Sequence, residues 1–155
     1  MSLIKVVVQA IFVCALGCSC ALPHLQAAAI DLNSPVPPIV QKGIALYASA
    51  GPVQALETWR QGGLLDGSRN DVQQTETFRE MVRPLRNYLS YELVATKEIC
   101  RTSKIVYLAM NFERGLLYAS FLVYHRADKE WIVQNMDFNT KPDVIMPWLA
   151  FEGVR

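Results

Sequence analysis

The chain has 155 residues, 52% of them hydrophobic, with 15 Lys and Arg side chains against 14 Asp and Glu. This length fits one domain, and the apolar content excludes a largely disordered chain. The near-zero net charge provides no electrostatic attraction to nucleic acid or to an anionic membrane surface, so no nucleic-acid partner is expected.

The N-terminus has the pattern of a secretory signal peptide. Lys5 is followed by the apolar run Val6–Leu16 and then by small residues, which is the order of such a leader. The run is shorter than the ~20 residues of a membrane span. We therefore expect residues 1–28 to be a signal peptide, cleaved between about Ala21 and Ala29. The mature form is then exported without a membrane span, as in the bacterial periplasm.

Two alternatives for the leader stay open. Small residues precede Cys18 and Cys20, so a lipid anchor on either cysteine is one alternative, and an uncleaved anchor is the other. Loss of the leader leaves 14 basic and 14 acidic groups and a single thiol, Cys100. A chain with one thiol forms no intramolecular disulfide, so the mature protein depends on its core for stability.

Residues 29–38 are expected to form an extended, proline-rich lead-in, and residues 39–155 a single domain that begins with helices. Apolar side chains recur there at the spacing of one buried helix face. In the third helix this face includes Val72, and Pro84 should kink or shorten the helix. The predicted helices are Ile39–Ser49, a segment from Pro52 to a stop at Gly62-Gly63, and Asp71–Asn87.

From Leu89 onward the apolar pattern is that of strands. In the first strand Tyr91, Leu93 and Ala95 alternate with Glu92, Val94 and Thr96, and the next two strands are apolar on both faces. Tight turns between them predict an antiparallel meander, and one helical turn follows within Asp143–Leu149. The predicted strands are Leu89–Cys100, Lys104–Glu113, Leu116–Arg126 and Trp131–Asn139.

This order of elements predicts an α+β fold, with three N-terminal helices packed on a curved four-stranded antiparallel sheet. The helices can cover one apolar face of that sheet. The second face should therefore be a dimer interface or the wall of a cavity.

The chain resembles the nuclear transport factor 2-like superfamily in its helical lead and its four-strand meander. The resemblance rests on patterns of apolar and aromatic residues over about 35–145. It implies a cone-shaped domain with a pocket between sheet and helices, and often a dimer packed through the sheet, but no particular reaction. The stretches that carry it are Tyr91-Glu92-Leu93, Gly115–Tyr118 with Tyr124, Trp131-Ile132-Val133, and Phe138–Pro142.

Motifs for metal or nucleophilic chemistry are missing from the sequence. There are two histidines, one mature cysteine and no paired metal-ligand spacing, so neither a metal nor another cofactor is expected. A Cys100–His125 pair is conceivable, but the favoured interpretation makes Cys100 a small strand-end or core residue.

Acid–base chemistry, as in the isomerases of this fold, has one weak catalytic candidate, Asp137. If Asp137 shares a strand face with Trp131 and Val133, its carboxylate ends an apolar surface, where desolvation raises its pKa. In the alternative, which we favour, Asp137 faces solvent while Met136 and Phe138 point inward. The hydroxyl donors for the first arrangement are Tyr91, Tyr107, Tyr118 or Tyr124.

Aromatic residues mostly build core, and some of them are expected to line a ligand pocket. The predicted pocket residues are Trp59, Tyr91, Tyr107, Tyr118, Phe121, Tyr124 and Trp131. A row of arginines, Arg79, Arg83 and Arg86, is interpreted as a solvated helix face paired with Glu76 and Glu80.

The sequence therefore favours an exported, non-catalytic domain that binds a small apolar ligand or a protein partner through its pocket and sheet. One alternative is an isomerase- or cyclase-type enzyme acting through Asp137. The other is a structural envelope protein that forms a homodimer through the sheet.

Overall fold

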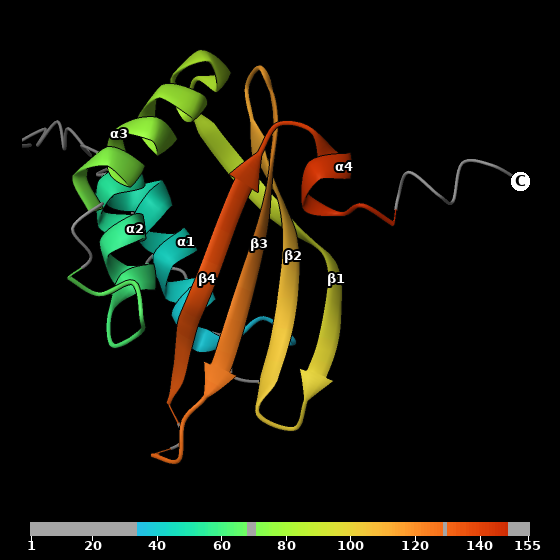
Figure 1. Ribbon diagram of the computed structural model, residues 1–155. Coiled ribbons are helices and arrows are strands. Elements are labelled where there is room, and N and C mark those ends of the chain that lie inside the picture. The colour runs from blue at the N-terminus through green and yellow to red at the C-terminus, as the bar shows by residue number, and fades with distance from the viewer. Residues whose placement is uncertain (1–33, 68–70, 129, 149–155) are drawn as a thin grey trace, which may run out of the picture.

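The computed structural model describes residues 34–67, 71–128 and 130–148, and its three longer helices precede its strands along the chain (Figure 1). The predicted leader, with Cys18 and Cys20, lies outside the described residues. The helices are α1 (Pro38–Ala50), α2 (Pro52–Arg60) and α3 (Asp71–Val82), followed by a 3₁₀ turn over Arg83–Leu85.

The helix boundaries follow from proline and glycine. Proline stands in the first turn of α1 and of α2, where its missing N–H costs no hydrogen bond. Gly51 separates the two helices with φ 93°, a conformation that suits glycine. The α-helix of α3 ends at Val82, two residues before Pro84, which confirms the predicted early end. Val72, however, is 77% exposed, so its predicted place on the buried side is wrong.

The strands form one antiparallel meander of order β1-β2-β3-β4, as predicted. The chain then turns through the short helix α4 (Pro142–Ile145). The fold is therefore α+β, with three longer helices before a four-stranded sheet. The strands are β1 (Tyr88–Cys100), β2 (Ser103–Phe112), β3 (Gly115–His125) and β4 (Trp131–Asn139).

The sheet is not strongly curled, in contrast to the expected cone. The central pair explains this, because β2 and β3 stay in register from Ser103 opposite Tyr124 to Phe112 opposite Gly115. Bulges bend and twist a strand, and here they are confined to the β1–β2 and β3–β4 pairings.

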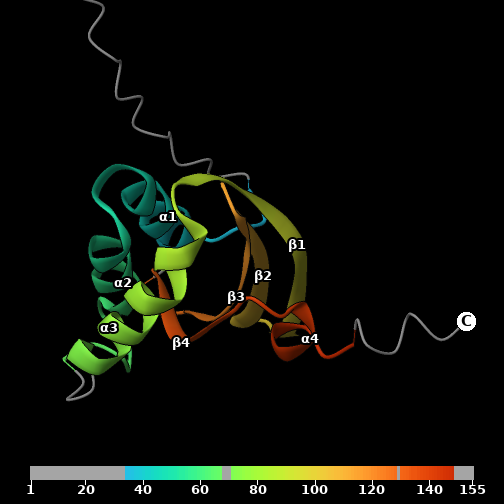
Figure 2. The same cartoon turned by 90° about the horizontal axis from the view of Figure 1, so that it is seen from above.

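Helices α1, α2 and α3 cover one face of the sheet, which we call the inner face (Figure 2). Phe121 and Trp59 are completely buried between the layers, with ring centroids 4.9 Å apart. The inner-face strand residues of this core are Val106, Leu108, Met110, Phe112, Leu117, Ala119, Phe121, Val123 and Val133.

Two bulges change which side chains reach the inner face. In β4, Val133 pairs with Val123 and Asn135 with Leu122, so Gln134 is an extra residue. Met136 and Phe138 consequently pack against the core, while Asp137 is exposed.

The bulge in β1 overturns the uninterrupted alternation expected there. Leu93 pairs with Leu108 on the inner face, whereas Ala95 pairs with Tyr107 on the opposite, outer face, because Val94 is an extra residue. Tyr91, Leu93 and Ala95 therefore do not share a face.

A short C-terminal segment covers part of the outer face. Ile145 and Met146 of α4 and its C-cap are buried against Tyr107, and the Trp148 ring lies edge-on to Tyr107 with centroids 4.6 Å apart. The apolar pattern of the strands predicts a dimer interface or a cavity on this second face, whereas the structure covers part of it with the chain itself.

Candidate functional site

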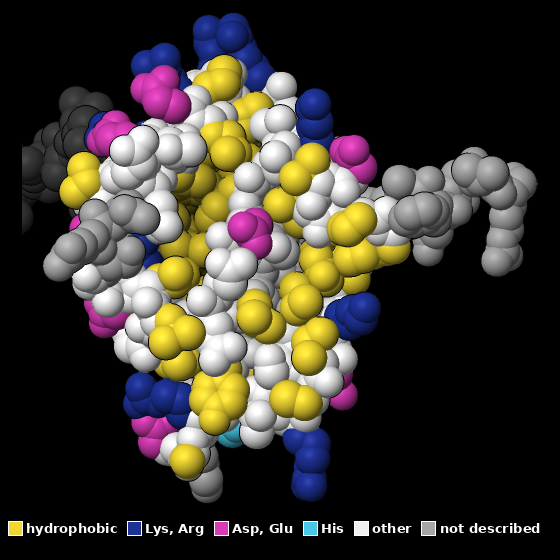
Figure 3. All heavy atoms as spheres, in the orientation of Figure 1, with side chains coloured by type: hydrophobic (Ala, Val, Ile, Leu, Met, Phe, Trp, Pro, Cys, Tyr) yellow, Lys and Arg dark blue, Asp and Glu magenta, His cyan; other side chains and the backbone are white. Residues whose placement is uncertain are grey.

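A cleft opens between helices α2 and α3 and the edge of β4. Its volume is about 260 Å³. Figure 3 shows it as a hollow between α3 and β4 in which hydrophobic side chains gather, with an acidic group at its border. The residues that line it are Leu56, Arg60, Leu65, Gln74, Thr77, Phe78, Met81, Asn135, Met136, Asp137 and Phe138.

The floor of the cleft is aromatic and thioether in character. Phe78 on α3 and Phe138 on β4 face each other with centroids 4.5 Å apart, and Met81 and Met136 complete the surface. Trp59 packs behind Phe138 at 5.7 Å and fixes its position. Flexible, polarisable methionine side chains suit a surface that must accept an irregular apolar molecule.

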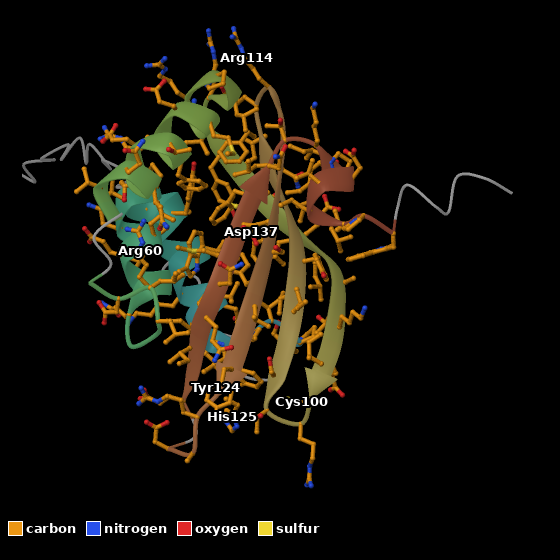
Figure 4. The ribbon with its side chains drawn as sticks, in the orientation of Figure 1. Arg60, Cys100, Arg114, Tyr124, His125 and Asp137 are labelled. Carbon is orange, nitrogen blue, oxygen red and sulfur yellow. The ribbon has the colours of Figure 1, made fainter. Side chains whose placement is uncertain are left out.

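Polar groups stand on both sides of this floor. Arg60 is only 5% exposed, and its guanidinium donates from Nη1 to Thr75 Oγ1 at 3.1 Å and from Nη2 to Gln74 Oε1 at 3.4 Å. Across the cleft, Asn135 Nδ2 donates to Asp137 Oδ2 at 2.9 Å. Figure 4 shows Arg60 on α2 and Asp137 on β4, on opposite sides of the opening.

Two other hollows are larger, but neither of them is lined by phenylalanine or methionine side chains. One, of about 480 Å³, lies over α2 and α3 and is bordered by Glu57, Glu76 and Arg79. The other, of about 470 Å³, has Lys42 and Glu130 on its border. The cleft beside β4 combines apolar and aromatic side chains with a few polar groups, which is the composition of a small-molecule site.

The predicted pocket residues do not form one pocket. Trp59 and Phe121 are core residues, whereas Tyr107, Tyr118 and Tyr124 belong to the outer face. Tyr91 lies on β1 and is 36% exposed. Trp131 lies near the far end of β4, against His125 with ring centroids 4.8 Å apart, and lines the hollow beside Lys42. None of these seven side chains is among those lining the cleft.

The cleft residues that sequence analysis did not select had partial signals. In the sequence, Phe78 and Met81 fall at helical spacing on the apolar side of the predicted helix Asp71–Asn87. Either Trp59 or Arg60 continues the helical spacing of Val53 and Leu56 in the second helix. The contribution of Met136 and Phe138 depends on the bulge at Gln134, and no sequence pattern marks that residue as extra.

The proposed donor tyrosines are spread over both faces of the sheet. Asp137 pairs with Ser120 on the outer face, at the rim of the cleft, and Tyr118 and Tyr124 share that face. Among the described residues, Asp137 makes no hydrogen bond to a tyrosine; its carboxylate accepts one from Asn135.

The Cys100 and His125 side chains lie at the same end of the sheet (Figure 4). Cys100 is exposed, and its Sγ lies 3.6 Å from Thr102 Oγ1. That hydrogen bond lowers the pKa of the Cys100 thiol. Cys100 is thus a strand-end residue, and its described side-chain contact is with Thr102.

Two tyrosines have strongly perturbed acidity. Burial raises the pKa of Tyr47 to about 12, and the neighbouring Tyr88 adds to the shift. Burial also raises the pKa of Tyr88 to about 12, with a further contribution from Tyr91. The Tyr47 and Tyr88 ring centroids are 5.3 Å apart, and neither residue lines the cleft. The two pKa shifts therefore result from the packing of α1 against the sheet.

The predicted arginine row extends past the end of α3, with Arg83 in the 3₁₀ turn and Arg86 after it, and its ion pairs are solvated. Arg79 pairs with Glu76 at 3.0 Å and Arg83 with Glu80 at 2.8 Å, and all four side chains are more than half exposed. Within the part of the chain that the structure describes, no three His, Cys, Asp or Glu side chains gather as a metal site. The described helices are too short or too polar to cross a bilayer.

Comparison of the chain with protein-family models, with curated proteins and with solved structures finds no match. The function must therefore be argued from the site itself.

Proposed function

We propose that this chain is an exported, non-catalytic binding domain whose cleft between α3 and β4 takes a small apolar molecule. The observation that carries the proposal is the floor of Phe78, Met81, Met136 and Phe138 in an opening of about 260 Å³. A dry protein cavity of about 150 Å³ is enough to bind benzene. The cleft therefore has room for a molecule of one ring or a short acyl chain.

The polar rim suggests how such a molecule is oriented. Arg60 and Gln74 lie on the helical side, and Asn135 and Asp137 on the strand side. A ligand with an apolar body and one hydrogen-bonding end can place its body on the floor and its polar end at this rim.

Acid–base catalysis at Asp137 is the second candidate, because this carboxylate does line the cleft. Its exposure to water favours binding over catalysis at this carboxylate. We also propose that the chain is a small member of the nuclear transport factor 2-like superfamily. The proposal is supported by two features that this chain shares with that superfamily: helices that precede a meander sheet, and a cleft between the helices and the sheet.

The binding proposal is tested by titrating the labelled protein with toluene, benzoate and hexanoate while its NMR spectrum is followed. We expect saturable shifts at Phe78, Met81 and Met136. Thr77→Trp places a bulky ring at the lining of the cleft and should abolish them. The control Gln73→Trp puts the same ring on an exposed position of α3 outside the cleft lining. Shifts that persist in Thr77→Trp, or no saturable shift with any of the three probes, would contradict the proposal.

A further inference from the structure

Strand β1 is an edge strand with an unusually apolar exposed surface. It pairs with β2 and stands at the end of the sheet order. All of its thirteen residues except Tyr88 and Ala95 are exposed. Nine large hydrophobic side chains are exposed in the described part of the chain, and five of them lie on β1: Leu89, Tyr91, Leu93, Val94 and Ile99.

An edge strand presents unpaired backbone N–H and C=O groups to any other strand, and natural proteins protect long edges with charges, bulges or covering segments. At the opposite edge, the turn after α2 approaches β4 so closely that a side chain at Gly63 would meet the Val133 carbonyl oxygen at 2.3 Å. No described helix lies beyond β1 in the plane of the sheet (Figure 1). Among the described residues, the β4 edge of the sheet is therefore approached by the turn after α2, whereas no helix covers the β1 edge.

The bulge at Val94 makes β1 complementary to itself. Because Val94 is extra, Glu92 lies on the outer face together with Ala95 and Lys97, opposite Ala109, Tyr107 and Ile105 of β2. Tyr91 and Leu93 lie on the inner face with Thr96 and Glu98. Without the bulge, Glu92 and Lys97 would point to opposite faces, since their separation is odd.

We propose that a second copy of this chain pairs with β1 in antiparallel fashion, about a two-fold axis at the Val94 bulge, to form a continuous eight-stranded sheet. In this register Glu92 of each copy stands opposite Lys97 of the other, and Leu93 stands opposite Thr96. Both pairs are on matching faces, as antiparallel neighbours must be. The two-fold axis repeats each pair, so the interface contains two acidic-to-basic contacts and closes as a dimer.

Charge complementarity favours a second copy over an unrelated strand. The opposite signs of Glu92 and Lys97, at positions equidistant from the midpoint between Val94 and Ala95, match only a partner that carries the same pattern in reverse. The inference is independent of the cleft, which lies beside β4 at the other edge of the sheet. A variant that loses ligand binding in the cleft should therefore still dimerise, and a monomeric variant should still bind the ligand.

The test is sedimentation equilibrium of the purified chain and its charge variants. We expect the wild type to be a dimer. Lys97→Glu and Glu92→Lys each replace two attractions with two repulsions, and should raise the dimer dissociation constant about tenfold or more. The double variant Glu92→Lys/Lys97→Glu restores opposite signs in this register and should recover most of the affinity. Lys42→Glu, an equal charge change on exposed α1, should leave the dissociation constant unchanged.

All the substituted positions are exposed, so each variant should keep its fold, and circular dichroism checks this. A double variant as weak as the single variants would overturn the proposed register. A monomeric wild type at high micromolar concentration would overturn the dimer, and protection of its β1 amides from hydrogen exchange would then assign the edge to another segment of this chain. Open-ended oligomers would overturn the two-fold closure.

Discussion

The indole Nε1 of Trp59 on α2 donates a hydrogen bond to the carbonyl oxygen of Val40 on α1 at 3.2 Å, across a contact made possible by Gly43. Trp59 is completely buried. A Cβ atom at position 43 would lie 1.9 Å from that indole nitrogen, so the two helices approach here through a glycine. This contact fixes α2 against α1, and through Trp59 it also supports Phe138 in the cleft floor.

Gly43→Ala should destabilise the fold strongly. The new methyl group overlaps the Trp59 ring, and the surrounding core is too tightly packed to move without strain. We expect a loss of about 2–3 kcal/mol in the free energy of unfolding, measured by urea denaturation. Lys42→Ala, on the exposed side of the same helix, should change it by less than about 0.5 kcal/mol. A Gly43→Ala protein as stable as wild type would contradict the close approach.

Arg60→Lys should weaken the attachment of α3. The guanidinium reaches Thr75 and Gln74 with two nitrogens, and a lysine ammonium cannot reproduce that fork. We expect a loss of about 1–2 kcal/mol by denaturant unfolding. In the matched change Arg79→Lys, an exposed ion pair is altered instead, and its effect should stay within about 0.5 kcal/mol. Equal effects of the two changes would be evidence against the bridging role of Arg60.

The fold should lose stability at high pH through Tyr47 and Tyr88. Both pKa values are raised to about 12 in the folded state, from the model-compound value of 10.0. Between pH 10 and 12 the unfolded chain therefore releases these protons while the folded chain retains them. These two groups leave the free energy of unfolding independent of pH below pH 10, and they lower it as the pH rises toward 12.

Ultraviolet absorbance at alkaline pH should show tyrosines that titrate well above pH 10. Tyr47→Phe should remove one of them and flatten the loss of stability between pH 10 and 12. Titration of all the tyrosines together near pH 10 would contradict the buried packing of Tyr47 against Tyr88.

Deleting Gln134 should be tolerated, because this residue is extra in the β3–β4 pairing. Its removal leaves Val133, Met136 and Phe138 on the inner face and Asp137 on the outer face. We expect a cooperative thermal unfolding transition with a loss of about 1–2 kcal/mol. Deleting Leu122 from β3 should instead abolish the transition, since the residues on one side of the deletion then exchange faces. If both deletions unfold the chain, the bulge does not set the face of Asp137.

The sequence determined the element order because each element carries its own local signal. Pro52 marks one helix start and Pro84 one helix end, and the turn at Arg114-Gly115 separates two apolar runs. These signals depend on backbone conformation within a few residues. The predicted bounds of β4 therefore agree with the structure, and no predicted end of the other three strands differs by more than one residue.

The tertiary structure alone decided which residues meet. A bulge is a property of two paired strands, so the extra residues Val94 and Gln134 have no signal in their own strand, yet they set the faces of Leu93 and Asp137. The position of β1 at a free edge and the covering of Tyr107 by α4 likewise depend on long-range packing. Local residue spacing therefore predicted the strands, whereas the cleft beside β4 and the self-complementary edge exist only once those strands pair.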